Sequence, residues 1–305
     1  MKQALILFLK GLGMGAANVI PGVSGGTIAL ITGIYETFID ALKSFDLTAI
    51  KLLFQFKFKA FWEHINGSFL SAVLAGVAVS IFSLARLLEY LLDKQEVPTM
   101  GFFFGLIIVS VYSVGRTIEK WSPATIVSLV IGTGIAVGIA LLAPASENPA
   151  MFYVFLCGIV AVCSMILPGI SGSFVLLIMG NYALVLSAIG RFDLGILIPL
   201  GIGCVFGLVA FSHLLSWVFK SYRDETIGMM TGFVLGSLLV IWPWKVTLTQ
   251  TIERVGKDPK VAVTGFEWHM PDFGNPQTFW TIGFIVLGGL VIWGLEKMSS
   301  GKTEA

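Results

Sequence analysis

The sequence predicts an all-α integral membrane protein built from two related halves, and three observations support this fold class. Of the 305 residues, 56% are hydrophobic and only 12% are charged, whereas a soluble domain carries about 25% charged residues. Several apolar stretches approach the roughly 20 residues that a helix needs to cross a bilayer. The third observation is an internal repeat, in which residues 11–36 align with residues 158–183 at a constant offset of 147.

The repeat places an uncharged break between two apolar arms in each half. Residues 21–25 read PGVSG and residues 168–172 read PGISG. Because a connector in water usually carries charge, we expect each break to be the tip of a helical hairpin inside the membrane. Gly/Pro-interrupted segments at matching places in two halves are the best sequence pointer to a transporter's substrate site.

The first repeat is predicted to span residues 1–145. Its re-entrant hairpin covers residues 3–42, with arms at 3–20 and 26–42. Residues 43–66 mix lysines with aromatic residues and are predicted to lie on the membrane surface as an amphipathic segment. Three transmembrane helices follow, at about 67–91, 98–116 and 122–143.

The second repeat, residues 146–305, is predicted to follow the same order. Its hairpin covers 150–190, with arms at 150–167 and 173–190, and its helices lie at about 195–219, 225–243 and 278–297. A long polar loop separates the last two helices. No segment shows convincing strand alternation over several strands, so a membrane β-barrel is excluded and only helices are predicted.

Two hairpin arms and three helices make an odd number, so the second half is predicted to enter the membrane upside down relative to the first. This inverted topology follows whether the arms re-enter or fully span. Twelve of the 19 Lys and Arg residues then lie on the side of the N-terminus and seven on the other. The positive-inside rule therefore places both termini in the cytoplasm.

The chemistry of the two tips favours an anion. A helix that starts just after each tip exposes unpaired N–H groups, and nearby hydroxyls can donate hydrogen bonds. The alternative interpretation is that the motif only forms the tight turn that reverses a helix. The candidate substrate-binding residues are Asn18, Pro21, Gly22, Ser24, Gly25, Gly26, Thr27, Pro168, Gly169, Ser171, Gly172 and Ser173.

Four ionisable residues near apolar stretches are further candidates. Glu36 and Asp40 lie one helical turn apart and are predicted to couple transport to protons, or else to mark the approach of their arm to the cytoplasmic interface. Arg86 and Arg116 end long helices. An arginine fork suits phosphate, and the alternative for both is snorkelling to the interface.

Enzymatic chemistry is not predicted. The chain has no Walker loop and no nucleophile elbow with His and Asp partners. The three Cys and three His residues show no metal or redox spacing, and we expect no metal and no cofactor. The net charge of +1 argues against nucleic-acid binding. Transport without ATP hydrolysis by this chain is what remains.

The stretches MGAANVIPGVSGGTIALITGIYE, LPGISGSFVLLIMGNY, GFFFGLII and TGFVLGSLLVIWPW resemble the PopT-type polyprenyl-phosphate transporters, over roughly residues 1–297. The resemblance implies a flippase in the bacterial cytoplasmic membrane that recycles undecaprenyl phosphate from the outer to the cytoplasmic leaflet. The second copy departs from the first at Met165, Ser173 and Ala183, which replace Asn18, Gly26 and Glu36. The first tip is therefore expected to carry more of the polar chemistry.

Two rival functions stay open at this point. One is a transporter or channel for a small soluble anion, and the other is a membrane scaffold subunit without transport of its own. A lateral opening toward lipid would favour the lipid substrate. A water-lined pore would favour the soluble anion, and a tip region packed solid by side chains would favour the scaffold. A homo-oligomer is compatible with the sequence.

Overall fold

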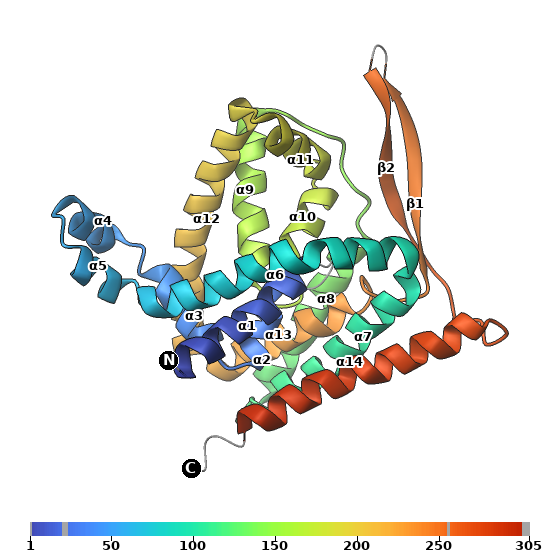
Figure 1. Cartoon of the computed structure of the whole chain (residues 1–305), viewed down its shortest axis with the longest axis horizontal. Coiled ribbons are helices and arrows are strands. Elements are labelled where there is room, and N and C mark those ends of the chain that lie inside the picture. Colours follow the sequence, from blue (N-terminus) through green and yellow to red (C-terminus); the bar gives the residue numbers. More distant parts are fainter. Residues whose placement is uncertain (1, 20–23, 255–256, 301–305) are drawn as a thin grey trace.

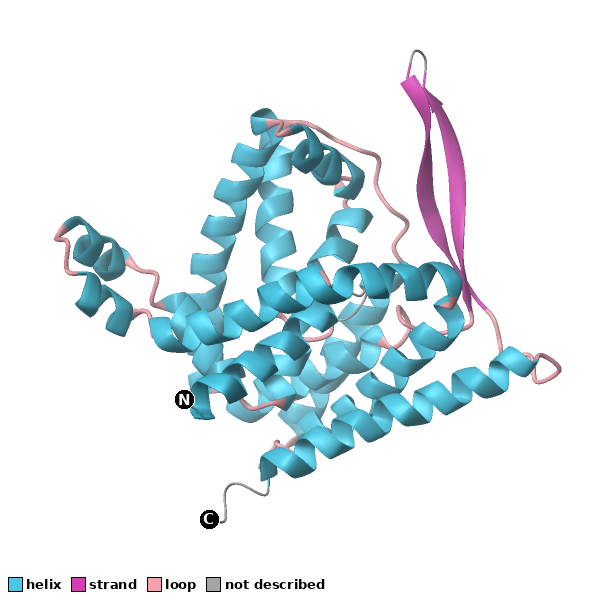
Figure 2. Ribbon diagram, viewed as in Figure 1, coloured by secondary structure: helices cyan, strands magenta, loops and turns pink. Residues whose placement is uncertain are grey.

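A computed structural model describes residues 2–19, 24–254 and 257–300 of the chain (Figures 1 and 2). The described chain is mostly helical, as predicted. The helices of the first half are α1 (Lys2–Val19), α2 (Gly25–Ile31), α3 (Tyr35–Lys43), α4 (Leu47–Phe54), α5 (Phe58–His64), α6 (Gly67–Lys94), α7 (Glu96–Gly115) and α8 (Pro123–Leu141). Those of the second half are α9 (Met151–Ile166), α10 (Gly172–Ile178), α11 (Tyr182–Arg191), α12 (Leu194–Ser221), α13 (Arg223–Ser237) and α14 (Pro276–Ser300).

Five described helices are long and apolar enough to cross a membrane. Their spanning stretches are Gly67–Leu84, Glu96–Gly115, Pro123–Leu141, Leu194–Ser221 and Pro276–Gly294. Helices α10 and α11 would together form a sixth stretch, but the chain bends by 111° between them. Helix α9 is shorter, at 16 residues.

The two halves share the order of their elements at two different offsets. The hairpins align at an offset of 147, whereas α6 starts at residue 67 and α12 at residue 194, which is an offset of 127. Both helices have 28 residues. The difference, 147 − 127 = 20 residues, corresponds to the segment with α4 and α5, which the second half lacks.

The turns after α6 and α12 also share their backbone geometry. Gln95 has φ −140° and ψ 47°, and Tyr222, 127 residues later, has φ −140° and ψ 60°. Thr99 and Thr226 each donate a side-chain hydrogen bond to the carbonyl eight residues earlier, at 3.3 and 3.4 Å. The two turns thus have the same local geometry at positions 127 residues apart.

Four close helix pairs stabilise the fold, two of them within the halves and two between the halves. Helix α1 packs along α6 and α9 packs along α12, each within its half. Helix α7 packs along α14 and α8 along α13, so the last helix of each half lies against the middle helix of the other. In each pair a glycine on either helix meets the partner's backbone, for example Gly105 at Ile285 and Gly288 at Phe102. Small residues permit this approach of helices in membranes.

The second arm of each hairpin is two short helices rather than the single helix predicted over 26–42 and 173–190. The chain breaks at Gly33 and Gly180, which have φ of +70° and +77°. These values lie in the left-handed region that glycine adopts without steric cost. The two glycines align in the repeat, so the same break occurs in both halves.

Two further sequence predictions are wrong in the second half. The helix predicted over 225–243 ends at Ser237, and the polar loop after it contains an antiparallel hairpin, β1 (Lys245–Arg254) and β2 (Lys257–Trp268), with Lys245 opposite Trp268. Residues 246–252 read VTLTQTI, and their β-branched residues favour a strand. The all-α class therefore omits this sheet.

The long helices run in two main directions. In Figure 1, α9 and α12 run up the view, whereas α6 and α14 run across it. The start of α1 and the end of α14 lie at the left and lower left of that view, and the β1–β2 hairpin points to the upper right. The segment 43–66 extends to the left as α4 and α5, and the carboxylate of Asp46 caps α4 by accepting a bond from the Ala49 N–H at 2.9 Å.

Candidate functional site: the joined hairpin tips

The described part of the first tip is buried, and its side chains and helix-start N–H groups are hydrogen-bonded to protein. Ser24 is 1% exposed and Thr27 0%. The Ser24 hydroxyl caps α2 by accepting a bond from the Gly26 N–H at 3.1 Å, and the Asn18 Oδ1 accepts one from the Gly25 N–H at 2.7 Å. Pro21 and Gly22, which were also predicted to bind substrate, lie outside the described residues.

The two tips touch each other directly, although they are more than 140 residues apart in sequence. The Ser24 hydroxyl donates to the carbonyl of Leu167 at 3.1 Å, and the Gly169 N–H donates to the Thr27 hydroxyl at 3.0 Å. A Cβ on Gly26 would lie 2.5 Å from the Ile166 carbonyl oxygen. Glycine is therefore the residue that lets α2 meet the end of α9.

Tyr35 adds a further contact at this joint. Its ring is 2% exposed, and its hydroxyl donates to the Ile166 carbonyl at 3.1 Å. The same ring packs on Phe219 of α12, with 5.7 Å between centroids. Helices α3, α9 and α12 are thus tied together around the first tip.

This conformation closes the space in which we predicted a phosphate. The hydroxyls and N–H groups of the first tip bond to protein rather than facing a cavity. A hollow beside the second tip, lined by Gly169, Ser171 and Phe174, has a volume of only 10 Å³. An anion can be bound between the tips only if they move apart.

The side chains of the second tip make fewer hydrogen bonds to other parts of the protein than those of the first tip. Ser171 occupies the cap position of α10 but makes no side-chain capping bond. Its hydroxyl instead pairs with that of Ser173 at 2.9 Å. Pro168, Gly169 and Gly172 are buried, whereas Ser173 is exposed. Hydroxyl groups thus extend from the interior to the surface here.

The two carboxylates of the first hairpin are tied to α12 and α13. Asp40 accepts from the Ser216 hydroxyl at 2.8 Å and from the Lys220 ammonium at 3.3 Å. Glu36 pairs with the Arg223 guanidinium at 3.4 Å. The side chains of Asp40 and Glu36 are 49% and 58% exposed. Both line an open pocket of 370 Å³ beside α3 and α5.

Sequence reasoning missed Arg223 as a link between the halves. Besides Glu36, its guanidinium contacts Glu119, after α7, at 3.3 Å. The neighbouring Asp224 accepts bonds from the N–H groups of Glu119 and Lys120, both at 3.0 Å. The run Arg223-Asp224-Glu225 at a predicted helix start was the available signal.

The two arginine candidates lie elsewhere. Arg116 is exposed at the C-terminal end of α7, and its guanidinium lies 5.6 Å from the centre of the Tyr112 ring. Arg86 belongs to α6, but its side chain lies outside what the structure describes. Their predicted contact with phosphate stays a prediction.

Comparison with known proteins identifies the family. Residues 14–258 match the model of the VCA0040-like family, described as undecaprenyl phosphate translocase-like. The chain belongs to this family. A protein of Vibrio cholerae named "polyprenyl-phosphate transporter" is 41% identical over 296 residues, which is 96% of each chain. One of Staphylococcus aureus with the same name is 32% identical over 261 residues, covering 78% of this chain and 86% of the relative. No solved structure matches the chain.

Proposed function

We propose that this protein transports polyprenyl phosphate across the bacterial cytoplasmic membrane, carrying undecaprenyl phosphate from the outer to the cytoplasmic leaflet. The observation that carries the substrate is the 41% identity, over 96% of both chains, to a relative named for polyprenyl-phosphate transport. The five apolar helices and the paired hairpins agree with a transporter that leaves the lipid tail in the bilayer and handles only the headgroup.

The proposed topology is the inverted repeat with both termini in the cytoplasm. In Figure 1, α6 starts near the lower-left end, where both chain termini lie, and runs to the right, whereas its repeat counterpart α12 starts at the top and returns toward that end. Helix α6 thus leads away from that end and α12 leads back to it, which supports inversion. Because α6 and α12 run in different directions, both would be tilted in the membrane, and tilts of up to about 40° occur in membrane proteins.

The proposed mechanism is alternating access at the joint between the tips. The Thr27–Gly169 and Ser24–Leu167 hydrogen bonds hold the closed state. When the tips part, the same hydroxyls and the N–H groups at the starts of α2 and α10 become available to phosphate. Non-helical backbone at membrane depth is tolerated when it is buried in protein or lines a cavity. In the closed state the backbone of the tips is buried in protein, and in the open state it would line a cavity.

The charged residues have proposed roles on the cytoplasmic side. Glu36 and Asp40 lie next to the cations Arg223 and Lys220, so protonation of either carboxylate would weaken a contact between α3 and the ends of α12 and α13. This is the proposed route by which protons would couple to movement of the tips. Arg86 and Arg116 remain proposed contacts for the phosphate.

The test is reconstitution in liposomes with undecaprenyl phosphate in the outer leaflet, followed by an assay of headgroup accessibility over time. The protein should move the headgroup to the inner leaflet faster than empty liposomes do. Gly172→Val should abolish this, because a Cβ there would lie 2.6 Å from the Ala161 carbonyl oxygen, whereas Gly190→Val is the control, with open space around its Cβ. No headgroup movement by folded wild-type protein would favour a scaffold, and uptake of inorganic phosphate alone would favour a soluble-anion transporter.

The topology has its own test. Cysteines introduced at Ser44 and Arg191 should react with impermeant reagents from opposite faces of the membrane, Ser44 from the cytoplasm. Labelling of both from one face would overturn the inverted repeat.

A further inference from the structure

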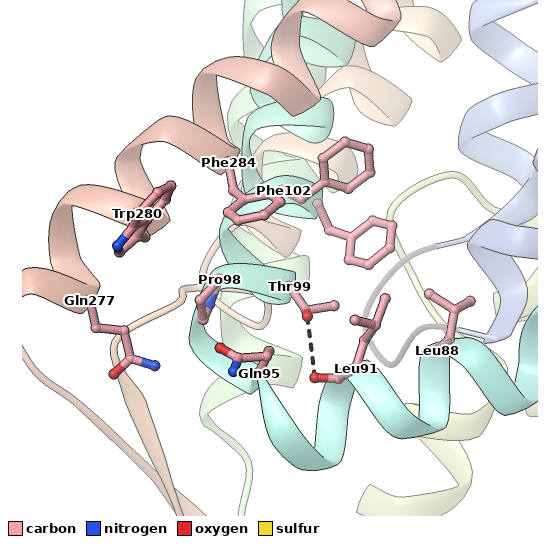
Figure 3. Close-up of a pocket in the computed structure, with 10 residues that line it drawn as sticks. Leu88, Leu91, Gln95, Pro98, Thr99, Phe102, Gln277, Trp280 and Phe284 are labelled. Atoms are coloured by element: carbon pink, nitrogen blue, oxygen red, sulfur yellow. Dashed lines mark hydrogen bonds between the residues drawn. The ribbon is translucent and has the colours of Figure 1, made fainter.

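A long apolar groove opens on the side of the molecule between α6, α7 and α14 (Figure 3). Its volume is 610 Å³, within the usual range for a small-molecule site of about 300–1,000 Å³. Trp280 and Phe284 of α14 form one wall, and Phe102 of α7 lies opposite. The rest of the lining is Leu88, Leu91, Gln95, Pro98, Thr99, Phe103 and Gln277. It is thus apolar except at the end with Gln95 and Gln277.

A polar hollow of 220 Å³ adjoins that end, because Gln277 lines both spaces. Among the described residues that line this hollow, Lys245, at the start of β1, is the one lysine or arginine. The ammonium donates to the Val240 carbonyl and lies 5.1 Å from the centre of the Phe266 ring. Burial lowers the pKa of Lys245 to about 8, and the nearby charge of Glu96 opposes that shift.

The hollow has a fixed frame. The Trp242 indole donates to the His269 carbonyl at 3.0 Å, and the Trp268 indole donates to the Leu239 carbonyl at 2.9 Å. These bonds pin the base of the β1–β2 hairpin to the end of α13. The carboxylate of Asp272, which also lines the hollow, accepts a bond from the Gly274 N–H at 2.9 Å. Among the described residues no salt bridge joins Lys245 to a carboxylate, although Asp272 lines the same hollow and the charge of Glu96 is near.

The repeat supplies a second groove for comparison, of 450 Å³, on the other half. Seven of its lining residues are those of the first groove moved by 127 positions: Leu215, Val218, Tyr222, Glu225, Thr226, Met229 and Met230. Glu225 stands where the first groove has Pro98. The second groove thus has an acidic group at its polar end, whereas the first adjoins a cation.

We propose that the groove between α6, α7 and α14 and the adjoining Lys245 hollow together form the entry site for polyprenyl phosphate, the isoprenoid tail lying along Trp280 and Phe284 and the phosphate at Lys245. The charge match carries the assignment: one cation at the end of an apolar channel complements one anionic group at the end of an apolar chain. Only part of a long tail fits, and the remainder stays in lipid. This inference rests on the proposed function and places the entry site on the outer face, because the β1–β2 hairpin and the start of α14 lie opposite the termini (Figure 1).

The test is photolabelling of the full chain in nanodiscs with a polyprenyl monophosphate that carries a benzophenone in its tail. Labelled peptides should come from α7 and the start of α14. Trp280→Ala should reduce labelling severalfold, and Phe279→Ala is its matched control, because Phe279 is 61% exposed on the same helix and does not line the groove. Labelling confined to other helices would overturn the proposal.

A second measurement isolates the phosphate. Lys245→Gln should weaken binding of the polyprenyl phosphate by about tenfold, the loss of one charge-assisted hydrogen bond, and should leave binding of the uncharged polyprenol unchanged. Lys94→Gln is the control, an exposed lysine at the end of α6 that pairs with Asp93. Equal affinity of the Lys245 and Lys94 variants for the phosphate would overturn the headgroup assignment. Headgroup transport by wild-type protein without labelling of the groove would remove this inference alone, whereas absence of transport would remove the proposed function.

Discussion

Replacing Thr27 with Val removes one hydroxyl from the joint between the hairpin tips and almost nothing else. Val has nearly the shape of Thr, and Thr27 is 0% exposed, so no new space opens. The loss is the acceptor of the Gly169 N–H, which lies 3.0 Å from the hydroxyl and is itself buried. The closed state then contains a buried N–H group without its partner.

The magnitude follows from that single group. A buried donor without a partner costs about 1–3 kcal/mol. If the bond exists only while the tips are joined, the whole cost falls on the closed state, and the ratio of open to closed molecules rises about 5- to 150-fold. Thr32→Val is the matched control, because the Thr32 hydroxyl bonds only within its own hairpin arm, to the Ile28 carbonyl at 2.7 Å and the Ala29 carbonyl at 3.4 Å.

Hydrogen exchange of a peptide that contains Gly169 reads the joint directly. Thr27→Val should speed exchange of that amide by a factor in the same range and should change the rate of headgroup transport in liposomes. Thr32→Val should change neither by more than about twofold. Equal exchange at Gly169 in the two variants would refute the view that this hydrogen bond holds the tips together.

Three other predictions concern the tips, the arginines and pH. Gly25→Val should stop transport more completely than Ser24→Ala, because a Cβ on Gly25 would lie 2.9 Å from the Met14 carbonyl oxygen, whereas Ser24→Ala removes only hydrogen bonds; equal transport rates would contradict this. If Arg86 or Arg116 holds phosphate, its change to Gln should abolish transport with folding intact. Its change to Lys should restore transport only in part, since Lys lacks the two-pronged guanidinium group that bonds phosphate. An unchanged transport rate in liposomes would show that the residue is an interfacial anchor. Binding of polyprenyl phosphate should weaken as pH rises through about 8, where Lys245 loses its charge, and titration of Lys245→Gln should lack this step. The sign follows because the anion binds the protonated ammonium, which exists below that pKa. Asp272 and His269 also line the hollow, the charge of Glu96 is near Lys245, and all three residues are present in both proteins.

Local rules were sufficient for most of the helices and for the repeat. Long apolar runs bounded by polar residues predicted the bounds of α6, α7, α8, α12 and α14 to within a few residues. The reason is that backbone N–H and C=O groups in lipid have no water to bond to and therefore bond within a helix. The breaks at Gly33 and Gly180 were visible as aligned glycines, but a glycine within an apolar arm does not by itself show that the helix stops. The left-handed φ at both positions comes from the fold.

The β1–β2 hairpin was missed for a different reason. Its two strands are long, at 10 and 12 residues, but the alternation of apolar and polar residues in VTLTQTI is modest, and the sequence alone does not show which segment pairs with it. Pairing of Lys245 with Trp268 depends on contacts at the base, where Trp242 and Trp268 bond to carbonyls distant in sequence. A two-stranded ribbon needs such support, because an isolated one is marginally stable in water.

The sequence by itself determined the membrane class, the two halves and the position of both tips, because apolar length, glycine, proline and the repeat are local properties. Only the tertiary structure decided what the tips do with their polar groups. Ser24 and Thr27 bond to Leu167 and Gly169, and Glu36 bonds to Arg223, across more than 140 residues. The same holds for Lys245, whose importance comes from the groove of α6, α7 and α14 beside it. Partners of this kind depend on which helices pack together, and no spacing within one segment specifies that.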